Sequence, residues 1–323
     1  MGALFRDFQS AASSSSLNSL DRDAAPRPQP AAAREPSRGA ARGDAAPAKD
    51  RESAADLAAS LSAAVAHGDA PDHVDRACRR AERHLRQGGA KDADDRALCD
   101  ALREARGDLM RRAPDATVAV SHARAAWSSQ HMKMQKTLEA LKKTSSREVD
   151  HDALRSVLLK DVEVATHFFA SLLELALRND VENEANADAV ERASAYNARG
   201  ATHALLMALG DLERYREAYG APPASRPTYQ TAEALYLQAQ RARAASGRAA
   251  GMVATVCALR RDAPAAVAHW AWRAHVAREP WEGGRGLALT HFEKCRAALD
   301  DTAQATGWRG TSAASSSKRG GAS

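Results

Sequence analysis

The sequence predicts an all-α protein, an antiparallel helical array flanked by two disordered tails. Alanine dominates the 44% hydrophobic fraction, aromatic residues make up only 5% of the chain, and β-branched residues are sparse. This composition favours helices over strands along most of the chain. Short breaks rich in Gly and Pro separate the apolar segments, which is typical of helices that pack antiparallel to their neighbours.

Ten helical segments are expected between the tails. They cover roughly 52–67, 71–87, 94–112, 117–143, 149–179, 187–219, 229–245, 249–260, 263–278 and 284–304. The segment 149–179 is apolar over more than one stripe and contains the pair Phe168-Phe169. A helix that is apolar on several sides is buried on several sides, so this segment is the predicted central core helix.

The two tails are predicted from their composition. Residues 1–50 combine a serine run, several prolines and alternating Ala and Arg, and residues 308–323 are rich in Ser and Gly. Neither tail can bury enough apolar surface to offset the conformational entropy of ordering the chain. The domain organisation that follows is a disordered tail over 1–50, a helical domain over 51–307, and a disordered basic tail over 308–323.

The net charge of +5 and the pI near 9.1 raise the question of a nucleic-acid partner. Residues 1–50 carry seven Lys/Arg and six Asp/Glu, and residues 308–323 carry three Lys/Arg and no acid, so 51–307 keep a net charge of only +1. This nearly balanced domain argues against a broad surface that tracks phosphates. A local basic patch formed by folding remains compatible with the sequence.

Cysteine usage and hydropathy indicate a reducing compartment without a membrane anchor. The four cysteines include no C-x-x-C pair, which argues against a disulfide framework and a zinc site. No run of about 18 apolar residues suggests a transmembrane helix. The start resembles a myristoylation signal only in Gly2, because Arg6 replaces the Ser or Thr of that signal. A cytoplasmic or nuclear location, with no membrane partner, is therefore expected.

No residue constellation in the sequence predicts an enzyme. A Ser/His/Asp arrangement, paired carboxylates in a recognisable frame and a glycine-rich phosphate loop are all missing. His291 and Cys295 are four residues apart and could share a metal ion, but two ligands without a second pair do not make a zinc site. We expect no catalytic residue, no cofactor and no metal.

A short internal repeat predicts TPR-type helix pairs. The pattern Ala232-x-x-x-Tyr236 recurs as Ala266-x-x-x-Trp270 at an offset of 34 residues, which is the TPR period. In the first copy Ala239 completes the A-x-x-x-F-x-x-A pattern of a TPR second helix. Small residues there let two helices approach closely, and the aromatic ring fills the gap between them.

One run of eight residues resembles a known family. Leu209-Gly210-Asp211-Leu212-Glu213-Arg214-Tyr215-Arg216 is similar to the L-G-D-[LI]-x-R-Y-[RK] stretch of the SMG and ever-shorter-telomeres adaptor family, whose domain is 14-3-3-like and contains TPRs. Further features follow in the family's order, and they are the Ser246-Gly247 turn, His269-Trp270-Ala271-Trp272-Arg273, Glu279-Pro280-Trp281 and Phe292-Glu293-Lys294. Upstream, Ala126-Trp127 with Lys133 resembles an earlier core helix. The resemblance covers roughly 117–299.

The chain departs from the family pattern in two places. Ala249-Ala250-Gly251-Met252-Val253-Ala254 stands where the family has Pro-Tyr-Asn-Gln-Leu-Ala, so the polar contacts expected there are missing. The chain also ends near the first TPR-like array, without the acidic PIN nuclease domain of some members. RNA cleavage is accordingly not expected.

The resemblance implies a phosphoserine or phosphothreonine pocket in a non-catalytic adaptor of nonsense-mediated mRNA decay. By motif position the phosphate-binding residues would be Arg214, Lys133 and the hydrogen-bond donor Tyr215, since guanidinium and ammonium groups from separate helices can hold a phosphate dianion. The implied partner is a phosphorylated protein segment, such as that of the decay RNA helicase, with a related adaptor as a possible heterodimer partner.

The same residues have simpler interpretations. Arg214 follows Asp211 by three residues and precedes Glu217 by three, so it could be an ion-pair partner within its helix. Lys133 could be one more surface lysine beside Lys136. Two other functions also fit the sequence: a telomerase-associated protein that binds RNA or single-stranded DNA, and a TPR-like scaffold that binds an unmodified helix or peptide.

Overall fold

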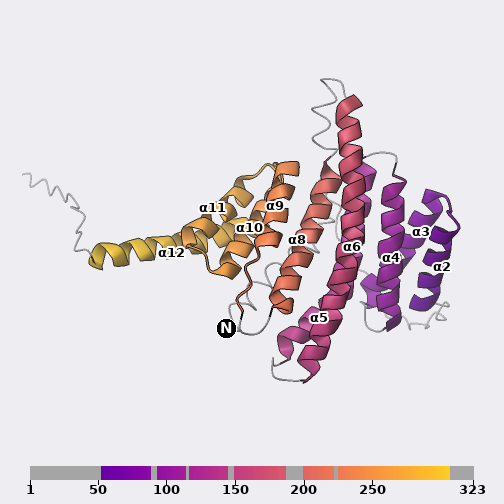
Figure 1. Cartoon of the computed structure of the whole chain (residues 1–323), viewed down its shortest axis with the longest axis horizontal. Coiled ribbons are helices and arrows are strands. Elements are labelled where there is room, and N and C mark those ends of the chain that lie inside the picture. Colours follow the sequence, from indigo (N-terminus) through magenta and orange to yellow (C-terminus); the bar gives the residue numbers. More distant parts are fainter. Residues whose placement is uncertain are drawn as a thin grey trace, which may run out of the picture.

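The computed structural model describes residues 52–88, 93–113, 116–144, 149–186, 199–221 and 225–305. Within these ranges it contains ten helices and no strand, which confirms the all-α fold class (Figure 1). The helices are α2 (Ala54–Ala66), α3 (Pro71–Gly88), α4 (Ala93–Arg111), α5 (Ala116–Lys143), α6 (Val149–Asn186), α8 (Gly200–Gly220), α9 (Gln230–Ala242), α10 (Gly247–Arg260), α11 (Pro264–Val276) and α12 (Gly284–Ala305).

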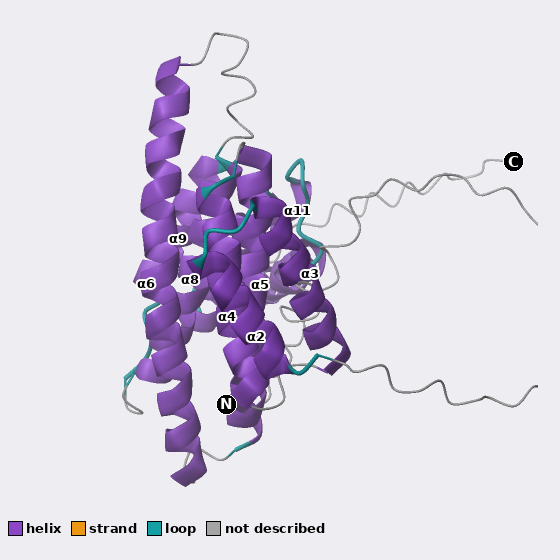
Figure 2. Cartoon of the chain, turned by 90° about the vertical axis from the view of Figure 1, so that its right-hand side faces the viewer, coloured by secondary structure: helices purple, strands orange, loops and turns teal. Residues whose placement is uncertain are grey.

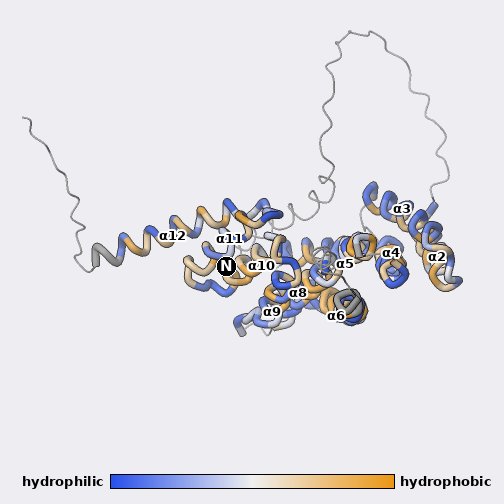
Figure 3. Tube along the Cα trace, turned by 90° about the horizontal axis from the view of Figure 1, so that it is seen from above, coloured by the Kyte–Doolittle hydropathy of each residue, from blue (hydrophilic) through white to orange (hydrophobic). Residues whose placement is uncertain are grey.

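The helices follow one another across the molecule in nearly the order of the chain. Seen from above in Figure 3, α2 and α3 lie at one end, α5, α6 and α8 in the middle, and α12 at the other end. The packing has the same order, because α4 contacts α2, α3 and α5, while α8 to α12 each contact the next helix. The predicted tails 1–50 and 308–323 lie outside the described residues.

The N-terminal helices form a small core of their own. α2 begins with a capping box, in which Ser53 Oγ accepts a hydrogen bond from the Asp56 N–H at 3.1 Å and the Asp56 carboxylate accepts one from the Ser53 N–H. α3 buries a regular stripe of its residues. The buried apolar residues of the three helices include Leu57, Leu61, Val74, Ala77, Cys78, Ala81, Leu85, Leu98 and Leu102.

The longest helix, α6, packs against α5 and α8 and projects beyond its neighbours, as Figure 2 shows. Phe169 is fully buried, and its ring centroid lies 5.8 Å from that of Trp127 on α5 and 5.1 Å from that of Phe168. The prediction of a central core helix is therefore confirmed. α6 nevertheless ends at Asn186 and not at the predicted residue 179, because the polar run after Arg178 contains no Gly or Pro.

Small residues allow the C-terminal helices to approach closely. A Cβ atom at Gly210 of α8 would lie 2.5 Å from the ring of Tyr236 on α9, and Tyr236 itself is fully buried. Ala232 and Ala239 flank that ring and are also fully buried. This is the contact that the A-x-x-x-F-x-x-A pattern predicts for the first helix pair. In α11, Trp270 at the repeated position is only partly buried.

The predicted boundaries of two other helices differ from the structure. The segment 187–219 becomes α8 only from Gly200, and residues 187–198 lie outside the described residues. α9 ends at Ala242, ahead of the predicted 245, because Arg243 leaves the helical region with φ −143° and ψ 81°. None of the described helices is both long and apolar enough to span a bilayer.

Candidate functional site

Arg214 lies in a buried cluster between α8 and α9. Its side chain is 11% exposed, its guanidinium lies 3.3 Å from the Asp211 carboxylate, and it stacks over the Tyr215 ring at 4.4 Å. The Tyr236 hydroxyl donates a second hydrogen bond to Asp211 at 2.7 Å. Of the two acids spaced three residues from Arg214, Asp211 is therefore its partner. The other, Glu217, accepts from the backbone N–H of Tyr229 instead.

This cluster keeps Arg214 charged although it is buried. Burial opposes the charge, but the surrounding Tyr215, Tyr236 and Asp211 outweigh that effect and raise the pKa of Arg214. Burial also raises the pKa of Tyr215. The Arg214 Nε atom is buried without a hydrogen-bond partner among the described residues. The arginine thus has one carboxylate partner and retains unused donor capacity.

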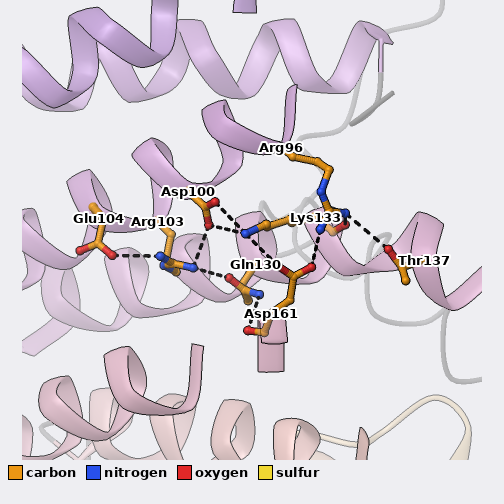
Figure 4. A network of polar contacts seen from close by, with 8 residues as sticks. All are labelled: Arg96, Asp100, Arg103, Glu104, Gln130, Lys133, Thr137 and Asp161. Atoms are coloured by element: carbon orange, nitrogen blue, oxygen red, sulfur yellow. Dashed lines mark hydrogen bonds and ion pairs between the residues drawn. The ribbon is translucent and has the colours of Figure 1, made fainter. Parts of the chain in front are cut away.

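Lys133 belongs to a different cluster, between α4, α5 and α6 (Figure 4). Its ammonium group lies 2.7 Å from Asp100 of α4 and 3.0 Å from Asp161 of α6, and its side chain is only 10% exposed. Arg96 of α4 contacts the same Asp161 at 2.5 Å. Two carboxylates therefore surround Lys133, and it is not the exposed surface lysine of the simpler interpretation.

Buried hydrogen bonds extend the Lys133 cluster on the other side. Arg103 donates to Gln130 at 2.7 Å and to Asp100 at 3.0 Å, and its guanidinium lies over the Phe168 ring. Each carboxylate in this region thus has at least one cationic partner, as Figure 4 shows. These contacts tie α4 to α5 and α6, which is a structural role.

The three predicted phosphate-binding residues do not share a contact. Arg214 and Tyr215 are neighbours on α8, whereas Lys133 contacts carboxylates of α4 and α6. Residues two positions apart on a helix point in nearly opposite directions, so on α5 it is His131 rather than Lys133 that turns toward Arg214. In agreement, burial lowers the pKa of His131; the Asp211 carboxylate opposes this shift, and the charges of Arg214 and Arg248 add to it.

Arg248 is a residue that the sequence reasoning did not single out. It lies in the first turn of α10, where the N-cap Ser246 makes no side-chain capping hydrogen bond and no acidic residue is present. An unpaired cation at a helix N-terminus is unfavourable, because the helix dipole is positive there. Arg248 makes no hydrogen bond or ion pair with the described residues, and it is only partly buried.

The charge of Arg248 also lowers the pKa of a second histidine. His203 of α8 is 4% exposed, and its Nδ1–H donates to the Ala239 carbonyl oxygen at 2.9 Å. Burial lowers the pKa of His203 to about 4, and the charges of Arg243, Arg248 and Arg124 act in the same direction. Of these cations, Arg243 is paired with Glu279. We name His131, Arg214 and Arg248 the cationic junction; these residues belong to α5, α8 and α10.

Other candidate ligands and side chains have ordinary environments. His291 is buried and Cys295 is partly buried on α12, and the described ranges contain no group of three or more His, Cys, Asp or Glu that could hold a metal ion. Trp281 covers Gly251 and Gly283, where a Cβ would meet its ring within 3 Å. Trp272 is 47% exposed and contacts Phe292 edge to face.

Comparison with known proteins does not assign the chain to a family. No protein-family model matches it. A search of curated proteins likewise found no match. The resemblance to the SMG and ever-shorter-telomeres adaptors therefore rests on the motif residues alone, and its functional implications stay predictions.

Proposed function

We propose that this chain is a non-catalytic adaptor that binds a phosphoserine or phosphothreonine segment of a partner protein, with a 14-3-3-like arrangement of TPR-type helix pairs. The observation that carries the proposal is the cationic junction. There the buried Arg214 of α8 has one carboxylate partner and a buried Nε without a hydrogen-bond partner among the described residues, and the charges of Arg214 and of Arg248 from α10 lower the pKa of His131 on α5. The Asp211 carboxylate opposes them, and it already accepts hydrogen bonds from Arg214 and Tyr236.

A phosphate dianion is the ligand that suits such a junction. It accepts bidentate hydrogen bonds from guanidinium groups and is stabilised at a helix N-terminus, where α10 has neither a capping side chain nor an acid. The resemblance supplies the ligand class, because its motif contains Arg214 and Tyr215. In this proposal Arg248 replaces Lys133 as the second cation. A phosphorylated segment of the decay helicase remains the partner that the resemblance suggests.

Arg248→Glu is the variant that tests the junction. Binding of a degenerate phosphoserine peptide library, followed by fluorescence anisotropy, is expected to weaken between tenfold and a hundredfold, since charge-assisted hydrogen bonds contribute about 1.5–3 kcal/mol. Arg241→Glu is the matched control, because Arg241 is exposed on the neighbouring α9 and the change in net charge is the same. Arg214→Glu is a poorer probe, since it also breaks a buried ion pair.

Phosphatase treatment of the library supplies the second arm of this experiment. Loss of binding on dephosphorylation, together with loss in Arg248→Glu and retention in Arg241→Glu, supports the adaptor. Binding that ignores phosphorylation, or that responds equally to both arginine variants, would contradict it.

A second candidate function is a scaffold that binds an unmodified partner helix. The observation favouring it is an apolar surface on α11 and α12, formed by Trp272, Val276, Leu289, Phe292 and Leu299, all 46% to 69% exposed. α12 packs mainly against α11, and these exposed side chains leave room for a further helix. Phosphate-independent binding that disappears in Phe292→Asp would favour this function over the phosphate-dependent one.

A further inference from the structure

Helix α3 separates its charges between two faces. Its acids Asp75 and Glu82 turn inward to Arg106 of α4, whose guanidinium lies 2.5 Å from each of them. The Arg106 side chain is 7% exposed. The hydrogen bonds from Arg106 and Arg79 outweigh the effect of burial and lower the pKa of Asp75. The carboxylates of Asp75 and Glu82 therefore neutralise the buried Arg106.

The outer face of α3 keeps the arginines. Arg76, Arg79, Arg80, Arg83 and Arg86 are all exposed. Arg79 pairs with Asp75, and the Arg83 Nε donates to the Arg79 carbonyl oxygen, whereas Arg76, Arg80 and Arg86 form no hydrogen bond or ion pair with the described residues. With His73, four of these arginines line a shallow hollow of about 340 Å³, and we call the five arginines and His73 the arginine face.

The acids near this face neutralise only part of it, since Asp75 pairs with Arg79. Asp69 is paired with His73 at 2.8 Å. Asp72, in the first turn, is the remaining acid of α3. α3 lies at the end of the array, where it packs mainly against α2 and α4, and Figure 3 shows it as a largely hydrophilic helix. The small net charge of residues 51–307 thus conceals a strongly basic local surface.

We propose that the arginine face binds the phosphodiester backbone of a nucleic acid without reading its sequence. Guanidinium groups repeated along one helix match the repeated phosphates of a strand. α3 contains no Phe, Tyr or Trp, so bases have no large aromatic stacking platform there. This inference is independent of the phosphopeptide site, which lies on other helices.

The lack of apolar anchors decides between a nucleic acid and an acidic protein. Protein interfaces usually bury apolar or aromatic anchors at their centre. None of the exposed large apolar side chains of the described residues lies on α3. Contacts with phosphates need no such anchor, because counterion release supplies the affinity. The arginine face therefore fits a nucleic-acid backbone better than an acidic protein surface.

The test uses the full chain and a variant with Arg76, Arg80 and Arg83 all changed to Gln. Binding to a fluorescent single-stranded RNA of mixed sequence is measured against salt concentration, with DNA of the same sequence as a second probe. The slope of log affinity against log salt should fall by about 2, because each lost phosphate contact removes about 0.7 on a single strand. Affinity for RNA and DNA should fall in parallel.

The matched control changes Arg278, Arg285 and Arg296 to Gln. These arginines are exposed at the opposite end of the array, so net charge changes equally. Retention of the wild-type slope in the control supports the arginine face. An equal loss in both variants, an unchanged slope in the α3 variant, or equally tight binding to polyglutamate would overturn the proposal. Circular dichroism checks that both variants keep their helices.

Discussion

Lys133→Ala is expected to lower the free energy of unfolding by about 3 kcal/mol. Its ammonium group lies between Asp100 and Asp161. Among the described residues, removing it leaves the buried Asp161 paired with Arg96 and Asp100 paired with Arg103. Breaking a buried pair from one side costs about 3–5 kcal/mol. Because Arg96 and Arg103 still pair with the two carboxylates, the expected loss of stability lies at the low end of that range. Urea denaturation measures the change.

Two variants separate this structural role from ligand binding. Lys133→Met keeps most of the side-chain volume, so a similar loss in that variant assigns the effect to the charge. Lys136→Ala, an exposed lysine one turn away, should leave stability nearly unchanged. If Lys133→Ala kept full stability but abolished phosphopeptide binding, Lys133 would be a ligand-binding cation and the account given above would be wrong.

Gly210→Val is expected to lower the free energy of unfolding by more than about 3 kcal/mol. A Cβ at this position would lie 2.5 and 2.7 Å from two ring atoms of Tyr236, and that ring has no room to move because it is fully buried. Overpacking a core costs about 1–3 kcal/mol. Displacing Tyr236 would also break its hydrogen bond to Asp211 and disturb Arg214.

Gly286 supplies the control for this prediction. It also lies inside a helix, but a Cβ there would meet no atom within 4 Å. Gly286→Ala should therefore stabilise the protein by up to about 1 kcal/mol through helix propensity alone. Thermal unfolding of the two variants gives the comparison. A neutral Gly210→Val would show that α8 and α9 do not need their close approach.

The sequence predicted most helices well, because helix propensity and the breaks between helices depend on residues that are near one another in the chain. High helix propensity and the Gly or Pro breaks set most boundaries, and the 34-residue repeat indicated the contact of Tyr236 with α8. The predicted end of α6 at residue 179 falls short of its end at Asn186. In the structure the Asp180 carboxylate accepts a hydrogen bond from Thr202 of α8, and the helix continues.

The site was less predictable because its partners are distant in the chain. The pair of Arg214 with Asp211 follows from a spacing of three residues on one helix. The partners of Lys133 come from α4 and α6, and no local pattern indicates that Asp100 and Asp161 meet there. Arg248 was not predicted as a site residue because it lies just before Ala249-Ala250-Gly251-Met252-Val253-Ala254, where the family pattern is lost. An arginine in a helical first turn without any acid was the available signal.

The most direct test of the cationic junction is the pKa of His131. It is measured by NMR of the imidazole signals, with and without a phosphoserine peptide. Burial, together with the charges of Arg214 and Arg248, holds this pKa below its ordinary value of 6.5 against the opposing charge of Asp211. A bound phosphate would favour the protonated imidazole, so the pKa should rise when the peptide binds. His122, whose pKa burial and Arg106 lower in another cluster, should not respond. An unchanged His131 at saturating peptide, or an equal response of both histidines, would contradict the account.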